Sequence, residues 1–366
     1  MILLLALAAC HTPWEEADVD GARLLTHTQH ASPNGRLRVD LEVLDGETSL
    51  ILSASTDTDH ITFLARIFDP EGDEVWTGRD LWESPYNRST AAFAASTTVL
   101  KWPMDAEDTP LRPGRWRFDV RTDQLDDPID LAAVVKADPT PHAGALAITL
   151  YVPDALPERL SSALDPAIAH WRDAIAAPVD LDLDVQRLAV DLPTTLSRPG
   201  GADGDTYAAL AADRDLRRVP VFAVQDIGDS PGVLGIAGNI PGPLTPTGRT
   251  AVTLDLTEGA GRDGTYDAAE IRLLGETMAH EVGHFLGLFH PVELPDDRDQ
   301  PDHWDALSDT PECSRLPACI STLGSNLMFP APVCLDPAGA ACDGFLPQTD
   351  LTPLQATSAH AYPAIP

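Results

Sequence analysis

The chain has 366 residues, which favours two domains over one, and its hydrophobic content of 43% is that of a globular protein. Its 33 prolines and 25 glycines are too many for a helical bundle and predict short strands, turns and long loops. With 24 basic and 57 acidic residues, the formal net charge is −33, which argues against nucleic acid and anionic lipid as partners.

The first ten residues, MILLLALAAC, form an apolar run that is too short to span a bilayer. The run resembles a secretory signal, and its end, Leu7–Cys10, resembles a bacterial lipobox. No basic residue precedes Cys10, which departs from that pattern and would be explained by a start codon assigned too late. The resemblance implies lipidation at Cys10 and a place in the bacterial cell envelope, at the outer membrane, or outside the cell. An ordinary cysteine on a frayed terminus is the alternative.

Residues 11–35 are polar and lack periodicity, so we expect a tether. From 36 to 137, apolar and polar residues alternate in several short runs separated by turn sequences such as Asp45-Gly46. This pattern predicts an all-β sandwich. The phrases IFDPEGDEVW and PLRPGRWRFDV resemble the jelly-roll accessory domains of secreted bacterial peptidases.

Residues 138–144, DPTPHAG, are typical of a linker, and the pattern changes after them. Strand-like runs then alternate with a helical segment at 165–177, which predicts an α/β (α+β) domain over 145–366. We expect strands at 145–152, 179–185, 219–224 and 250–256.

A helix is predicted over 268–288, with Asp267 as its N-cap. Its end carries HEVGHFLGLFH, in which His280 and His284 lie one turn apart on one face. Gly287 allows the chain to leave the helix with a positive φ, so that His290 can turn back as a third ligand. Three imidazoles with one open position are typical of a catalytic zinc.

Glu281 follows the first histidine and is predicted to act as the general base on a zinc-bound water. The alternative is a histidine-rich buried face with ordinary hydrogen bonds, and HExxH by itself does occur by chance. The longer pattern H-E-x-x-H-x-x-G-x-x-H fixes five positions and favours the metal site.

At these residues the chain resembles the metzincin zinc endopeptidases. The resemblance implies a methionine turn beneath the zinc, for which Met328 in SNLMFP is the candidate. Within the metzincins, the pappalysin-like family is most similar, through a cleft-edge strand at Leu234–Ala237 and through Asp309-Thr310-Pro311. Many relatives have a tyrosine two residues after the methionine, whereas this chain has Pro330.

Four cysteines lie in one 30-residue window, at Cys313, Cys319, Cys334 and Cys342. In an exported chain they predict two disulfides, with all three pairings open, and a structural zinc is the alternative. The aspartate-rich loop 294–313 lies where relatives bind Ca²⁺, which makes Asp296, Asp297 and Asp299 candidate calcium ligands. A solvated acidic loop is the alternative.

The sequence therefore predicts a secreted or surface-anchored zinc endopeptidase that hydrolyses protein or peptide substrates. One alternative is a surface binding or adhesion protein with a zinc peptidase-like domain of low activity. Another is a zinc hydrolase that acts on a non-peptide amide.

Overall fold

The structure is a computed structural model that describes residues 14–19, 21–56, 60–78, 84–87, 96–105, 107–137, 143–261, 263–293, 301, 303–335, 342 and 344–365. Cys10 and the three calcium candidates Asp296, Asp297 and Asp299 lie outside these ranges. No helix within them is long and apolar enough to cross a membrane.

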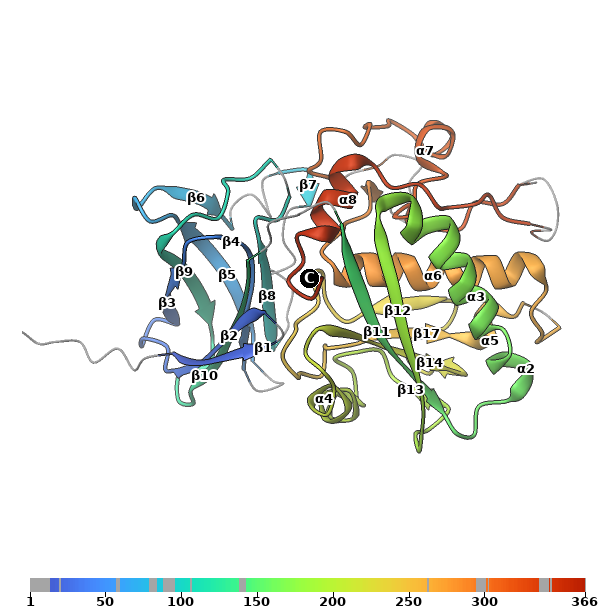
Figure 1. The fold of residues 1–366 in the computed structure, drawn as a ribbon, viewed down its shortest axis with the longest axis horizontal. Helices are drawn as coiled ribbons and strands as arrows, with labels where there is room; N and C mark the ends of the chain where they lie inside the picture. Colours follow the sequence, from blue (N-terminus) through green and yellow to red (C-terminus); the bar gives the residue numbers. More distant parts are fainter. Residues whose placement is uncertain are drawn as a thin grey trace, which may run out of the picture.

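Two antiparallel sheets form the N-terminal part of the chain (Figure 1). One sheet has the order β1-β2-β10-β4-β8 and the other the order β3-β9-β5-β6. Alternating residues of both sheets, such as Leu50 in the first and Trp116 in the second, are fully buried in one apolar cluster, as the period-two pattern predicts. We call these the N-terminal sheets. Their strands are β1 (Glu15–Val19), β2 (Ala22–Gln29), β3 (Arg36–Val43), β4 (Glu47–Ser55), β5 (Thr62–Phe68), β6 (Glu74–Thr77), β8 (Thr97–Trp102), β9 (Gly114–Thr122) and β10 (Ile129–Ala137).

The predicted tether over 11–35 is wrong where the structure describes it. Residues 15–19 and 22–29 are strands, and β2 pairs along its whole length with β10. Only Ala22 and Leu25 of β2 are fully buried. Of the remaining residues only Leu24 is apolar, so the strand carries little hydrophobic signal and depends on hydrogen bonds with its neighbouring strands.

The C-terminal unit, residues 144–365, is built on a second five-stranded sheet of order β12-β11-β14-β17-β16. The first four strands are parallel and β16 is an antiparallel edge strand. Small sheets join β13 to β15 and β18 to β19 and β7. The strands of these sheets are β11 (Gly144–Pro153), β12 (Leu181–Val190), β13 (Thr195–Leu196), β14 (Arg218–Val224), β15 (Asp226–Ile227), β16 (Gly235–Ala237), β17 (Val252–Asp255), β18 (Val292–Glu293), β19 (His303–Asp305) and, from the N-terminal part of the chain, β7 (Tyr86–Asn87).

The longest helix, α6 (Ala268–Phe285), begins at the predicted N-cap Asp267, which forms a capping box with Glu270. It packs closely on α3 (Leu164–Trp171). A Cβ on Gly275 would lie only 2.5 Å from the carbonyl oxygen of Ala167, so this contact requires glycine. The α3 helix continues as a π-helical turn (Arg172–Ala176) and a 3₁₀ turn (Ala177–Val179). The other helices are α2 (Glu158–Ser161), α4 (Gly204–Ala212), α5 (Leu256–Gly259), α7 (Leu316–Leu323) and α8 (Pro353–His360).

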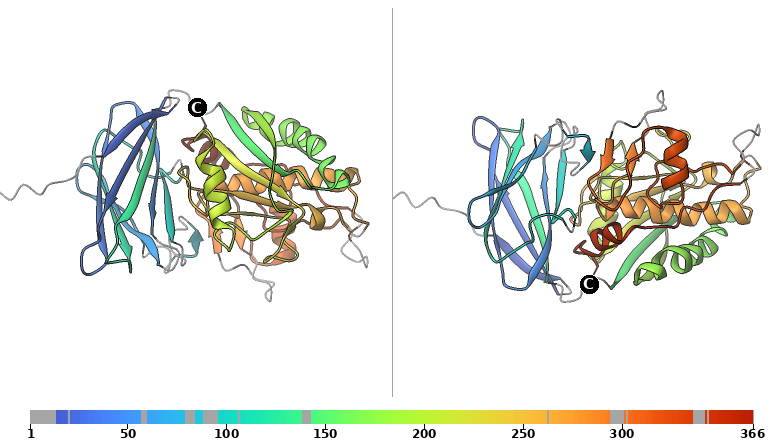
Figure 2. Two further views of the ribbon diagram at one scale, coloured as in Figure 1. Left: turned by 90° about the horizontal axis from the view of Figure 1, so that it is seen from below. Right: turned by 90° about the horizontal axis from the view of Figure 1, so that it is seen from above.

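The N-terminal sheets and the C-terminal unit share one interface, which Figure 2 shows from two sides. Four apolar residues of the sheets, Ala22, Ile51, Val99 and Val134, belong to the same buried cluster as the core of the C-terminal unit. Two buried lysines, Lys101 and Lys136, also donate hydrogen bonds across the interface. The two parts are therefore packed together through a continuous core.

Asp305 on β19 is buried, and burial raises the pKa of its carboxyl group to about 7. The folded protein thus retains this proton at pH values where the unfolded chain, with an aspartate pKa of about 3.9, has lost it. The free energy of unfolding should therefore fall as the pH rises from about 4 to 7. Asp305→Asn should remove this pH dependence, which lowers the free energy of unfolding of the wild type by about 2–4 kcal/mol at pH 7. Urea unfolding of both proteins at several pH values measures the effect. Parallel stability curves for the variant and the wild type would contradict the assignment.

Candidate metal centre

The end of α6 and the segment after it bring three histidines together. His280 and His284 lie one turn apart on α6, and His290 follows the turn that ends the helix. The Nε2 atom of His290 lies 3.0 Å from that of His284 and 3.3 Å from that of His280. Among the described residues, this is the single group of three or more such side chains whose ligand atoms converge within 4.8 Å.

Each of the three imidazoles is oriented by a hydrogen bond at its other nitrogen. The Nδ1 atom of His280 lies 2.8 Å from the carbonyl oxygen of Leu327, and that of His284 lies 2.8 Å from the carbonyl oxygen of Leu288. The Nδ1 atom of His290 lies 3.1 Å from the Glu293 carboxylate. Because these oxygens only accept, each Nδ1 carries the proton and each neutral ring directs a lone pair from Nε2 toward the same point.

Three converging lone pairs about 3 Å apart repel one another unless a cation lies between them. Burial lowers the pKa of His280 to about 3, and it lowers the pKa of His284 well below its ordinary value. Both rings therefore remain neutral at ordinary pH and cannot relieve the repulsion by taking up protons. Neutral imidazoles with oriented Nδ1–H groups are the donor set that Zn²⁺ prefers, so the residues present fit a zinc ion.

The turn that carries the chain from α6 to His290 is a Schellman motif. Leu288 N donates to Gly283 O, and Gly287 N donates to His284 O, both at 2.9 Å. Gly287 has a φ of +95°, which a residue with a Cβ adopts only under strain. The helix therefore ends at Phe285, three residues earlier than the apolar pattern predicts.

Glu281 is buried beside the histidines and against the edge strand β16. A Cβ on Gly235 would lie 2.8 Å from Cγ of Glu281, so only glycine lets the strand approach this closely. Burial raises the pKa of Glu281 to about 7, against the opposing effects of His290 and of the Ala237 N–H, which donates to the carboxylate. A carboxyl group with a pKa near 7 is suited to proton transfer at neutral pH.

Met328 lies beneath the histidine pair and is fully buried. A Cβ on Gly283, between the two helical histidines, would lie 2.7 Å from its sulfur. The residue is held by its own loop, because Met328 N donates to the side chain of Asn326, which in turn pairs with Gln355 of α8. The structure thus brings Met328 into contact with the helix segment that carries His280 and His284.

Met328→Ala should destabilise the protein by about 2–5 kcal/mol, because it leaves a cavity under the helix. Met328→Leu conserves the volume and should cost less than about 1.5 kcal/mol. Urea unfolding of both variants measures the difference. Equal stability of Met328→Ala and the wild type would show that the packing contributes nothing.

A cleft of about 270 Å³ opens beside His280 and Glu281. It lies between β16 and the segment after Met328, and its lining includes Gly235, Thr277, Phe329, Pro330, Ala331 and Gln348. Pro330, two residues after Met328, is one wall of the cleft. The described lining residues include no tyrosine.

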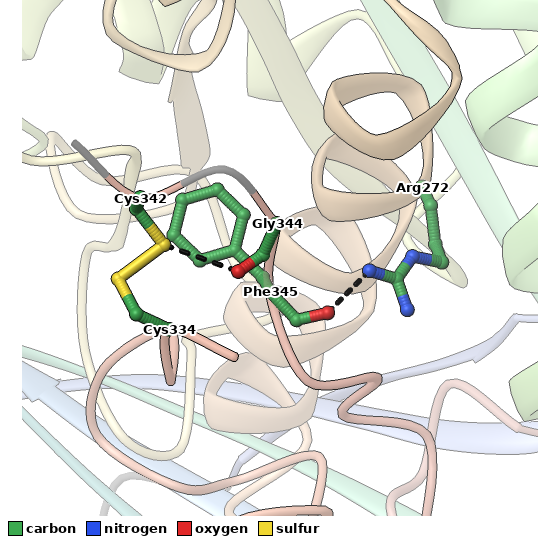
Figure 3. Close-up of a disulfide and its surroundings, with 5 residues drawn as sticks. All are labelled: Arg272, Cys334, Cys342, Gly344 and Phe345. Carbon is green, nitrogen blue, oxygen red and sulfur yellow. Dashed lines mark hydrogen bonds between the residues drawn. A yellow bond between two sulfur atoms is a disulfide. The ribbon is translucent and has the colours of Figure 1, made fainter. Parts of the chain in front are cut away.

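Two disulfides support the walls around the site. Cys313 pairs with Cys319, and both are buried in a cluster with Phe329, next to Met328. Cys334 pairs with Cys342. Figure 3 shows that this second bridge lies beside Phe345, whose carbonyl oxygen accepts a hydrogen bond from Arg272 of α6. Of the three pairings left open by the sequence, the structure has the one that joins neighbouring cysteines.

Sequence reasoning missed the residues that orient the imidazoles. Leu288 and Leu327 act through backbone carbonyls, for which their side chains give no signal. Glu293 lies three residues after His290, and a carboxylate so close to a predicted ligand could have been noticed.

No protein-family model matches this chain. No curated protein matches it either. Among solved structures, metalloproteinase-II from Bacteroides fragilis is similar over 47% of this chain and 53% of its own, with 12% identity and a TM-score of 0.28. Archaemetzincin from Methanopyrus kandleri is similar over 46% of this chain and 84% of its own, with 16% identity and a TM-score of 0.24. The chain thus spans about half the length of the first of these. Similarities this low identify no family and no activity, so function has to be inferred from the site itself.

Proposed function

We propose that this protein is a zinc-dependent endopeptidase. The observation that carries the proposal is the convergence of three Nε2 atoms, each from a ring whose Nδ1 is already bonded to an oxygen. His280, His284 and His290 would hold the ion and leave a further position open toward the cleft. Bound there, Zn²⁺ would lower the pKa of a water molecule to about 7 and polarise a substrate carbonyl group.

Glu281 would accept the proton from the attacking water and pass it to the leaving amine. Its buried position beside the histidines and its raised pKa support this role. Hydrolysis then needs no covalent intermediate with the protein. The charge that develops on the carbonyl oxygen would be stabilised by the ion.

An extended peptide is the substrate that the cleft fits best. The strand β16 is the edge of its sheet and runs beside Glu281, so a substrate strand could lie along it. The wall formed by Phe329, Pro330 and Ala331 faces the cleft from the other side and would receive a side chain next to the cleaved bond.

We further propose a location in the cell envelope or outside the cell. Two disulfides form readily only in an oxidising compartment, which supports export. Lipidation at Cys10 and a calcium ion at Asp296, Asp297 and Asp299 remain predictions from the sequence, because these residues lie outside the described part of the chain.

The test is metal analysis combined with cleavage of a peptide library by the purified full chain. We expect one zinc per chain, cleavage inside peptides rather than at their ends, and loss of cleavage with a chelator. Readdition of zinc should restore the activity. Stoichiometric zinc without cleavage of any peptide or protein, including casein in a zymogram, would favour the binding-protein alternative. Absence of zinc would overturn the proposal.

A further inference from the structure

Lys101, on β8 of the N-terminal sheets, is a buried cation with three acceptors in the C-terminal unit. Only 2% of the residue is exposed. Its Nζ atom donates to Ser358 Oγ at 2.6 Å, to Ser358 O at 2.7 Å and to Leu286 O at 3.3 Å. Ser358 Oγ itself donates to Met104 O, so it is free to accept from Lys101. Three acceptors match the three N–H donors of an ammonium group.

The bond to Leu286 completes the end of the helix that carries His280 and His284. The carbonyl oxygens of Val282, Gly283, His284 and Phe285 each accept from a backbone N–H, those of Leu286, Leu288, Gly287 and Gly242. The next carbonyl, Leu286 O, accepts from Lys101. A helix leaves its last carbonyls without partners inside the helix, and these negative ends attract a cation. A lysine of the N-terminal sheets thus serves as part of the C-cap of α6.

Lys101 also packs directly on the turn that leads to His290. A Cβ on Gly287 would lie 3.2 Å from both Cε and Nζ of Lys101. The same turn places Leu288 O, which orients the ring of His284. Two of the three histidines therefore depend on this turn. Leu288 O orients the ring of His284, and the backbone of the turn leads directly to His290.

Nearby charges favour the protonated form of Lys101, whereas its burial opposes that form. Burial lowers its pKa to about 7, while the carboxylates of Asp105 and Asp108 act in the opposite direction. The dipole of α6 adds to the effect of these carboxylates, because its negative end faces the ammonium group.

From this geometry we infer that Lys101 is a positioning residue for the metal site, and that the N-terminal sheets are needed to hold the third ligand in place. The inference rests on the proposed zinc site. It predicts that loss of one hydrogen-bonding group in the N-terminal sheets weakens metal binding by the C-terminal unit.

Lys101→Met tests this in the full chain, because methionine keeps the length of the side chain and removes its donors. The matched control is Lys136→Met. Lys136 is 3% exposed and donates across the same interface to His360 O at 2.9 Å, at the end of α8. The measurements are the zinc dissociation constant by chelator competition, the visible spectrum of the cobalt-substituted protein, and hydrogen exchange of the amides at 286–290.

Lys101→Met should raise the zinc dissociation constant by about 10-fold or more, the range typical of groups that orient metal ligands without touching the metal. It should also alter the cobalt spectrum and accelerate exchange at 286–290. Lys136→Met should leave all three measurements near the wild-type values. Equal zinc affinity and an identical cobalt spectrum in Lys101→Met and Lys136→Met would overturn the inference.

If Lys101→Met fails to fold, Ser358→Ala decides, because it removes only one of the three acceptors of Lys101. A measurable rise in the zinc dissociation constant would support the inference, and an unchanged constant would overturn it. Failure of the proposed function looks different, since the wild type would then bind no zinc. If the wild type binds zinc and cleaves peptides while Lys101→Met does both equally well, only the positioning role is wrong.

Discussion

Replacing Glu281 with glutamine should lower peptide hydrolysis by about 10²–10⁴-fold while zinc remains bound at one ion per chain. Glutamine has nearly the same shape and fits beside Gly235, where Cγ of Glu281 already lies close to the strand. It cannot accept a proton from water, so the loss should fall on the turnover number. Peptide binding should change little, because the three histidines and the walls of the cleft are untouched.

The measurement is steady-state cleavage of the best library peptide, with metal analysis of the same sample. Glu276→Gln is a demanding control, since Glu276 is also a buried glutamate of α6 that lines the cleft, but it lies beside His170, one turn before the histidine pair. It should retain far more activity than Glu281→Gln. Hydrolysis by Glu281→Gln within about threefold of the wild type would exclude Glu281 as the general base, given the size of effect expected for such a group.

Replacing His290 with alanine should weaken zinc binding by roughly 100-fold or more. Structural zinc sites with four ligands bind with about 10–16 kcal/mol, so one ligand corresponds to about 3 kcal/mol. The variant also leaves the Nε2 atoms of His280 and His284 without a third donor, and it removes the hydrogen bond that Glu293 accepts from His290. Hydrolysis should be lost at ordinary zinc concentrations.

Zinc content after dialysis and the zinc-dependent increase in melting temperature are the two measurements. Zinc at 100 times the wild-type dissociation constant should stabilise the wild type by about 2.7 kcal/mol, and this increment should fall to about 0.4 kcal/mol or less in the variant. His30→Ala, at an exposed histidine that follows β2, is the control and should keep the full increment. If His290→Ala retains stoichiometric zinc through dialysis, the third ligand is another residue.

Much of the helical part of the site could be predicted from the sequence. The period of 3.6 residues fixes His280 and His284 on one face of α6, and Asp267 marks its beginning through a local capping box. Gly287 was a sound prediction for the exit turn because the need for a positive φ is a property of a single residue. Such features depend on neighbours within a few positions along the chain.

Strand β2 shows where this reasoning failed. Its polar residues pair with β10, which lies about a hundred positions later in the chain, and no local sequence pattern predicts such a pair. The disulfide pairing was open for a related reason. Four cysteines allow three connections, and only the folded backbone brings Cys313 near Cys319 and Cys334 near Cys342.

The sequence by itself determined which side chains could bind a metal and move a proton, because helical geometry and residue chemistry are local. The tertiary structure decided how those side chains are held. The carbonyl of Leu327, the approach of β16 to Glu281 and the reach of Lys101 to Leu286 each join segments that lie dozens to hundreds of residues apart. Contacts of this kind form only when the sheets and helices have packed. Their energies therefore depend on the folded structure, and local sequence patterns do not predict them.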